Sequence, residues 1–175
     1  MELDRAKVRY LLPGIRRGVV LSSVPLVLVG VVFAANDVGG GLAWAVGRSV
    51  LAVVLLAVVT RLGDGRGDPE RTLRVLSWVM VVSSAGWGAL AVMVDTSEVE
   101  WRAFVVVSLI ANLAIVTVQC AADLRVFLCG VVPVTVLGVV GLFPRADGEL
   151  LLPLLFAIGT PYAFALFASS NRALI

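Results

Sequence analysis

Three side chains inside apolar stretches of this sequence are of types that bind ligands, namely Trp44, Arg48 and Asn112. Arg48 lies two helical turns into an apolar run, a depth of roughly 10 Å at the rise of an α-helix. A charged side chain at that depth in a bilayer is costly unless it reaches the headgroups or finds a partner. Trp44 precedes it by one turn and can stack on the guanidinium. These residues predict a polar site within an apolar bundle.

Each of these residues has a second interpretation that the sequence leaves open. Arg48 either extends to the outer headgroups, or faces the bundle and pairs with an anionic ligand or an acid of the hydrophilic segment 95–100. Asn112 falls near the middle of its apolar run, where an amide must find a hydrogen-bond partner. Its amide either joins two helices or contacts a ligand.

The residue types that are missing exclude most catalytic sites. The chain has no histidine, which removes the usual general base and the commonest metal ligand. It also has no phosphate-binding glycine loop after a strand and no pair of carboxylates within an apolar run. We therefore expect no enzyme activity, no metal and no other cofactor. Cys120 and Cys129 are expected to be free, packing residues, and a net charge of +2 gives no basis for nucleic-acid binding.

The elements that must position these side chains are long apolar runs. Hydrophobic residues make up 60% of the chain, mean hydropathy is +1.04, and several runs reach the roughly twenty residues that a helix needs to cross a bilayer. We expect one all-α domain over 1–175, an integral membrane bundle of six transmembrane helices. The predicted spans are 18–35, 42–62, 73–94, 103–120, 126–143 and 150–168. A basic segment, 1–17, precedes them, and Pro13–Gly14 is expected to break this segment from the first span.

The distribution of charge predicts the orientation of the helices. The one long hydrophilic run, 61–74, carries four arginines, and such loops remain in the cytoplasm. With that loop inside, both termini are cytoplasmic, and eleven of the fourteen basic residues lie inside; Arg48, Arg102 and Arg145 are the exceptions. Thirteen of the fourteen are arginine, which is typical of a GC-rich bacterial genome. The predicted location is the bacterial plasma membrane.

Small residues and prolines predict how the helices pack and bend. Ser84 and Gly88 form a small-xxx-small pair that lets another backbone approach closely. Pro133 interrupts the fifth run, and Gly159 and Pro161 form a possible flexing point in the sixth. The connections are short, so consecutive helices should be antiparallel neighbours.

Together these features resemble a bacterial family. Trp44 with Arg48, the exit at Arg61, the stretch 84–88, Pro133 and a sixth helix running into 171–174 resemble the six-helix amino-terminal membrane domains of diguanylate cyclases, phosphodiesterases and sensor histidine kinases. The resemblance implies a sensory domain whose last helix passes a signal to a cytoplasmic output domain in the same polypeptide, in a possible homodimer. Any output enzyme would follow Ile175.

The alternative class is a small free-standing transporter or permease. Transporters gather polar residues at mid-membrane and use broken helices in corresponding halves of the chain. Asn112, Gln119 and Thr160 could line a path, but Pro25 and Pro133 do not occupy corresponding positions of the two halves.

Overall fold

A computed structural model describes residues 2–62 and 67–144, together with residues 154, 156, 158–160, 162, 164, 165 and 167; side chains 21–25 are outside the described set. It defines five α-helices, and the described residues include no strand. In chain order the helices are α1 (Glu2–Ala35), α2 (Gly41–Arg61), α3 (Pro69–Met93), α4 (Val99–Gln119) and α5 (Leu124–Leu142).

Four of these helices, α2 to α5, are long and apolar enough to cross a bilayer. The predicted helical fold is therefore confirmed for the described residues, and these four helices are suited in length and composition to a membrane. In α1 the described apolar run is shorter, Leu26–Ala35. The described residues between 154 and 167 have helical geometry, but most of the predicted sixth span lies outside the described residues. Six passes and two cytoplasmic termini stay predictions.

Two aspartates fix where helices begin on the side of the hydrophilic run. Asp68 accepts a hydrogen bond from the Glu70 backbone N–H at 3.1 Å, and Pro69 occupies the first helical position of α3. Asp123 accepts from the N–H groups of Arg125 and Val126 at 2.9 and 3.2 Å, which begins α5. These caps place the starts of α3 and α5 a few residues earlier than hydropathy alone predicts.

The amino-terminal segment differs from its prediction. No break occurs at Pro13–Gly14, because α1 runs unbroken from Glu2 to Ala35. Its amino-terminal half carries an apolar stripe at helical spacing whose members are buried: Val8, Leu11, Leu12, Ile15 and Val19. An interior proline costs about 3 kcal/mol of helix stability. Burial of this stripe against the bundle outweighs that cost.

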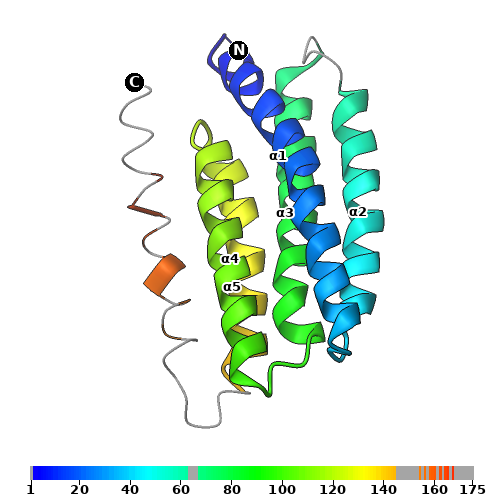
Figure 1. Ribbon diagram of the computed structural model, residues 1–175. Coiled ribbons are helices and arrows are strands. Elements are labelled where there is room, and N and C mark those ends of the chain that lie inside the picture. The colour runs from blue at the N-terminus through cyan, green and yellow to red at the C-terminus, as the bar shows by residue number, and fades with distance from the viewer. Residues whose placement is uncertain are drawn as a thin grey trace.

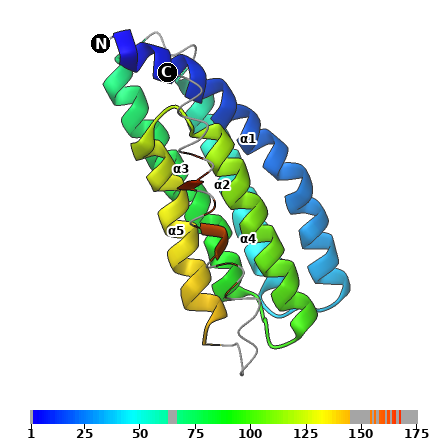
Figure 2. The ribbon, with the colours of Figure 1, turned by 90° about the vertical axis from the view of Figure 1, so that its left-hand side faces the viewer.

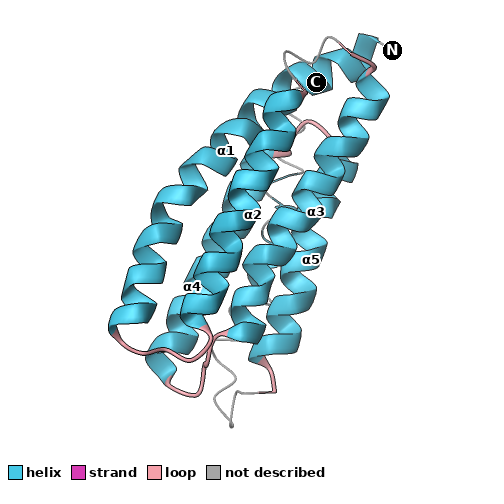
Figure 3. Ribbon diagram, turned by 90° about the vertical axis from the view of Figure 1, so that its right-hand side faces the viewer, coloured by secondary structure: helices cyan, strands magenta, loops and turns pink. Residues whose placement is uncertain are grey.

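Helix α3 lies at the centre of the described bundle. It contacts each of the other four helices, whereas α2 contacts only α1 and α3. Figure 1 shows α1 and α4 in front of α3 and α5, with α2 beside α1, and Figures 2 and 3 show the same arrangement from the two sides. Consecutive helices are neighbours, as the short connections predict. The closest pairing, α3 with α5, is not consecutive.

Glycines bring α3 and α5 together. A Cβ added at Gly88 would lie 2.7 Å from Leu137 Cβ and 3.1 Å from Val134 Cα, and one added at Gly141 would meet the backbone of Ala91. Gly88, predicted to pack, therefore lies at the α3–α5 crossing, and its partner Ser84 is buried beside it. Pro133 lies within α5, which continues through it.

Candidate functional site: a polar cluster beside a central cavity

Arg48 faces the bundle interior. Its side chain is 4% exposed, its Nη2 donates to Ser83 Oγ at 3.1 Å, and its guanidinium carbon lies 5.5 Å from the ring centroid of Trp87. Its Nε and Nη1 have no hydrogen-bond partner among the described residues, and no described carboxylate pairs with it. The structure therefore buries a cation beside α3 with one hydrogen bond and one aromatic face.

Trp44 does not stack on Arg48 in the way the spacing predicts. Its Nε1 donates to the Gly86 carbonyl at 2.8 Å, and its ring packs 5.5 Å from Trp87 and 6.3 Å from Phe33. Glycine at position 86 permits this approach, because an added Cβ there would lie 2.9 Å from the Leu51 side chain and 3.1 Å from Arg48 Cδ. Trp44 thus supports Trp87, which in turn faces Arg48.

Asn112 lines a cavity of about 580 Å³ between α1, α3 and α4, which we call the central cavity. The amide is 8% exposed, and its Nδ2 has no partner among the described residues. Ser83 and Trp87, the two contacts of Arg48, line the same cavity. The remaining lining residues are Ile15, Gly18, Val19, Val29, Val79, Met80, Ser108, Ala111, Ala114, Ile115, Val116, Val118 and Gln119.

Ser83 of α3 and Asn112 of α4 both line the central cavity. The side chains of Met80 and Val116, one turn from each of them on the same two helices, both reach Gly130 of α5. Because α3 and α4 are antiparallel, Ser83 and Asn112 stand on facing stretches of these helices. The structure thus brings two of the three predicted site residues together: Asn112 directly, and Arg48 through Ser83.

Sequence reasoning missed Ser83 and Trp87 as partners of Arg48. Both stand in the stretch SSAGWGAL, which predicts close packing rather than polar contacts. Their spacing of four residues, on one face of α3, is the signal that could have paired them with an arginine on a neighbouring helix. Ser84, the other half of that serine pair, is 1% exposed and its Oγ has no partner among the described residues.

A second buried arginine closes the end of the bundle opposite the hydrophilic run. Arg102, in the first turn of α4, is 2% exposed and donates from Nε to the Thr96 carbonyl at 3.1 Å and from Nη2 to the Ser97 carbonyl at 3.3 Å. Asp95, a predicted partner of Arg48, instead accepts from the Ser97 N–H at 3.0 Å. Arg102 therefore holds the connection between α3 and α4.

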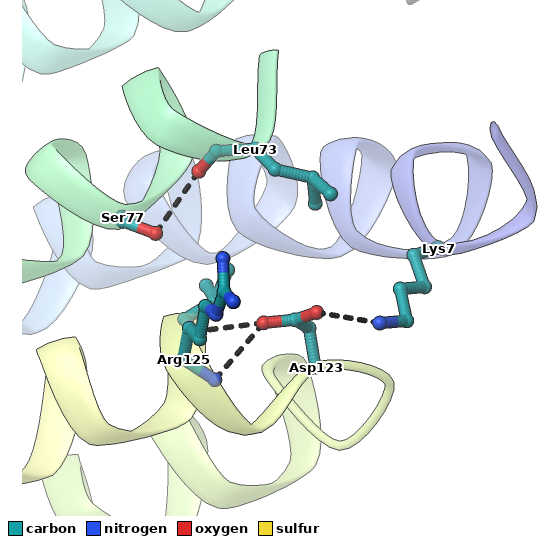
Figure 4. Close-up of polar contacts among 6 residues, drawn as sticks. Lys7, Leu73, Ser77, Asp123 and Arg125 are labelled. Atoms are coloured by element: carbon teal, nitrogen blue, oxygen red, sulfur yellow. Dashed lines mark hydrogen bonds and ion pairs between the residues drawn. The ribbon is translucent and has the colours of Figure 1, made fainter. Parts of the chain in front are cut away.

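At the other end, an ion pair joins α1 to the turn before α5. Lys7 Nζ donates to Asp123 Oδ2 at 2.9 Å, and the other carboxylate oxygen accepts from the start of α5. Figure 4 shows this arrangement. A groove of about 680 Å³ adjoins this pair and is lined by charged side chains of α1, α3 and α5 together with Cys129 and Trp78. Both polar groups of the pair are satisfied, so we assign it a structural role.

Two further groups of residues bear on the sequence predictions. The described residues include no group of three or more histidine, cysteine or acidic side chains able to hold a metal, and Cys120 and Cys129 are both free. Thr160 Oγ1 lies 3.4 Å from Thr135 Oγ1 of α5, and the neighbouring Gly159 lies against Ile110. Pro161 is outside the described residues, so the predicted flexing point stays a prediction.

Comparison with known proteins gives no relative: no family model, no curated protein and no solved structure matches this chain.

Proposed function

We propose that this chain is the sensory or input domain of a bacterial plasma-membrane protein, with six spans and both termini in the cytoplasm. In this proposal the central cavity receives the stimulus, and the last helix passes it to a cytoplasmic output domain in the same polypeptide, in a homodimer. The resemblance in the sequence motivates the class of protein.

The observation that carries the proposal is the buried Arg48 beside the cavity. Arg48 is buried without a described counter-charge, and burial of a charge is unfavourable unless something compensates it. The packing of the helices alone does not explain such a residue. A ligand that neutralises Arg48 would offset that cost. Since α3 contacts every other described helix, a change at Ser83 or Trp87 would be transmitted to the whole bundle.

The charges at the two ends of the helix bundle support the proposed orientation in the membrane. The start of α1, the end of α2 at Arg61, the start of α3 at Pro69 and the turn before Leu124 lie at one end of the bundle in Figure 1. That end carries Arg61, Arg71 and Arg74, and positive charge favours the cytoplasm. The opposite end carries the α1–α2 turn and the acidic segment between α3 and α4.

Two measurements test the proposal. The reading frame beyond Ile175 should continue into a coiled coil and an output domain, and a stop codon directly after it would contradict the proposal. In the full-length protein, Arg48→Met should change the output activity at least severalfold, whereas Arg74→Met should not, because that side chain is 71% exposed. Equal output from both variants at equal membrane levels would also overturn the proposal.

A permease-like protein is the second candidate. The same cavity favours it, because the amides of Asn112 and Gln119 both line the cavity, one near mid-helix and one at the end of α4. Polar groups spaced along a cavity are typical of a transport path. Substrate-dependent flux in proteoliposomes that falls with Asn112→Leu would favour this candidate, and no flux above empty liposomes would exclude it.

A further inference from the structure

The part of the central cavity lined by Ser83 and Asn112 offers hydrogen-bond donors and positive charge. Asn112 Nδ2 is a buried donor without a described partner. Ser83 Oγ accepts from Arg48, so its own hydrogen remains available to donate. In a region of low dielectric constant, the Arg48 charge one side chain away strengthens any bond to a negative acceptor. This part of the cavity therefore suits an oxyanion.

The rest of the cavity suits an apolar chain. Between Asn112 and Gln119, whose amide lies at the end of α4, the lining is apolar, with Val19 from α1, Met80 from α3 and Val116 from α4 as buried walls. The α4 residues that line it run from Ser108 to Gln119, a length of about 16 Å at 1.5 Å per residue. The cavity is thus elongated along the bundle.

The cavity opens on the lipid-facing side of α4. Four of its lining residues are exposed: Ala111, Ala114, Ile115 and Val118. In a helix that crosses the bilayer, such residues face acyl chains rather than water. A ligand that enters here comes from the membrane, and it must be able to reside there.

We propose that the central cavity binds a single-chain amphiphile with an oxyanion head, a carboxylate or a phosphate. The head accepts hydrogen bonds from Ser83 and Asn112 beside the Arg48 charge, and the chain lies along the α1–α4 opening. This inference rests on the proposed sensory function, for which it names the class of ligand.

Photolabelling of the full chain in nanodiscs tests this site. The probe is hexadecanoic acid with a diazirine in its chain, and the labelled residues are identified by mass spectrometry. We expect labels on α4 between Ser108 and Gln119 and on the facing parts of α1 and α3. Excess hexadecanoate or hexadecyl phosphate should displace the probe, and whichever does so better identifies the head. Equal displacement by uncharged hexadecanol would overturn the proposal.

Matched variants separate the cavity from the lipid-facing surface. Ala111→Trp, at the opening, should reduce labelling roughly tenfold, whereas Val107→Trp should not, because Val107 is exposed one turn away and does not line the cavity. Arg48→Met should weaken binding about tenfold or more and Arg48→Lys less, because the lysine keeps the charge. Size-exclusion profiles and thermal unfolding verify folding. Unchanged labelling in folded Arg48→Met and Ala111→Trp proteins would overturn the site.

The outcome also separates this inference from the proposed function. If the probe labels the cavity but Arg48→Met leaves the output of the full-length protein unchanged, the ligand site stands and the sensory function fails. If Arg48→Met changes the output but neither anion displaces the probe, the sensory function stands and the ligand class is wrong.

Discussion

Arg48 of α2 stands over Trp87 of α3, with 5.5 Å between the guanidinium carbon and the ring centroid, and bonds to Ser83 one turn along the same helix. The contact couples a charge on α2 to the helix that touches all the others. Because Trp44 packs on Trp87 and bonds to Gly86, the position of the ring depends on both helices.

The first prediction contrasts the two buried arginines. Replacing Arg48 by methionine removes a costly buried charge and one hydrogen bond, so the unfolding temperature of the purified protein should stay the same or rise. Replacing Arg102 by methionine leaves the carbonyl of buried Thr96, and that of exposed Ser97, without the bonds that Arg102 donates, and should cost roughly 2 kcal/mol. Thermal unfolding in detergent measures both variants. Comparable destabilisation by the two would mean that Arg48 also serves the fold.

The second prediction concerns the α3–α5 crossing. Gly88→Ala should destabilise the bundle by roughly 1–3 kcal/mol, because the added methyl group would lie 2.7 Å from Leu137 Cβ. The control is Gly47→Ala in α2, where an added Cβ has no neighbour within 4 Å. Alanine is the better helix former, so this variant should be neutral or stabilised by up to about 1 kcal/mol. Equal unfolding temperatures for the two variants would contradict the close approach at Gly88.

The sequence predicted where the helices lie along the chain better than it predicted which helices pack against each other. Apolar runs of spanning length locate α2 to α5, since bilayer thickness sets that length. The break at Pro13 was wrong, because burial of the stripe from Val8 to Val19 is a tertiary effect that proline propensity does not contain. Short connections predicted that consecutive helices are neighbours, but the pairing of α3 with α5 was not predictable, because lipid provides no hydrophobic force to select neighbours and the choice depends on shape, as at Gly88.

The candidate site shows the same difference between features of a single helix and features that depend on how two helices pack. Arg48 and Asn112 stand out as polar residues in apolar runs, so sequence alone identifies them. Ser83 and Trp87 do not stand out, because their role depends on which face of α3 meets α2. The expected Trp44–Arg48 stack followed from spacing within one helix, whereas the observed partner, Trp87, comes from another helix.

The third prediction uses the two cysteines to test orientation. Cys120 is fully buried, whereas Cys129 is partly exposed in the groove beside Lys7 and Asp123. A membrane-impermeant maleimide should label Cys129 in inverted vesicles and not in intact spheroplasts, and Cys120 should react only after denaturation. The Cys129→Ser variant is the control. Labelling of Cys129 from the outside would reverse the proposed orientation.

The last prediction concerns the ion pair between Lys7 and Asp123, whose side chains are 28% and 9% exposed. Asp123→Asn removes the charge but keeps a side chain that can cap α5, so it should cost only the pair, less than about 1 kcal/mol. Asp123→Ala also removes the cap and should cost about 1 kcal/mol more. Lys7→Met should lower stability by the same amount as Asp123→Asn. The double variant that carries both changes should lose little stability beyond either single change. Thermal unfolding of all four proteins gives the comparison. Fully additive losses would show that α1 is held to this turn by its apolar stripe and not by the ion pair.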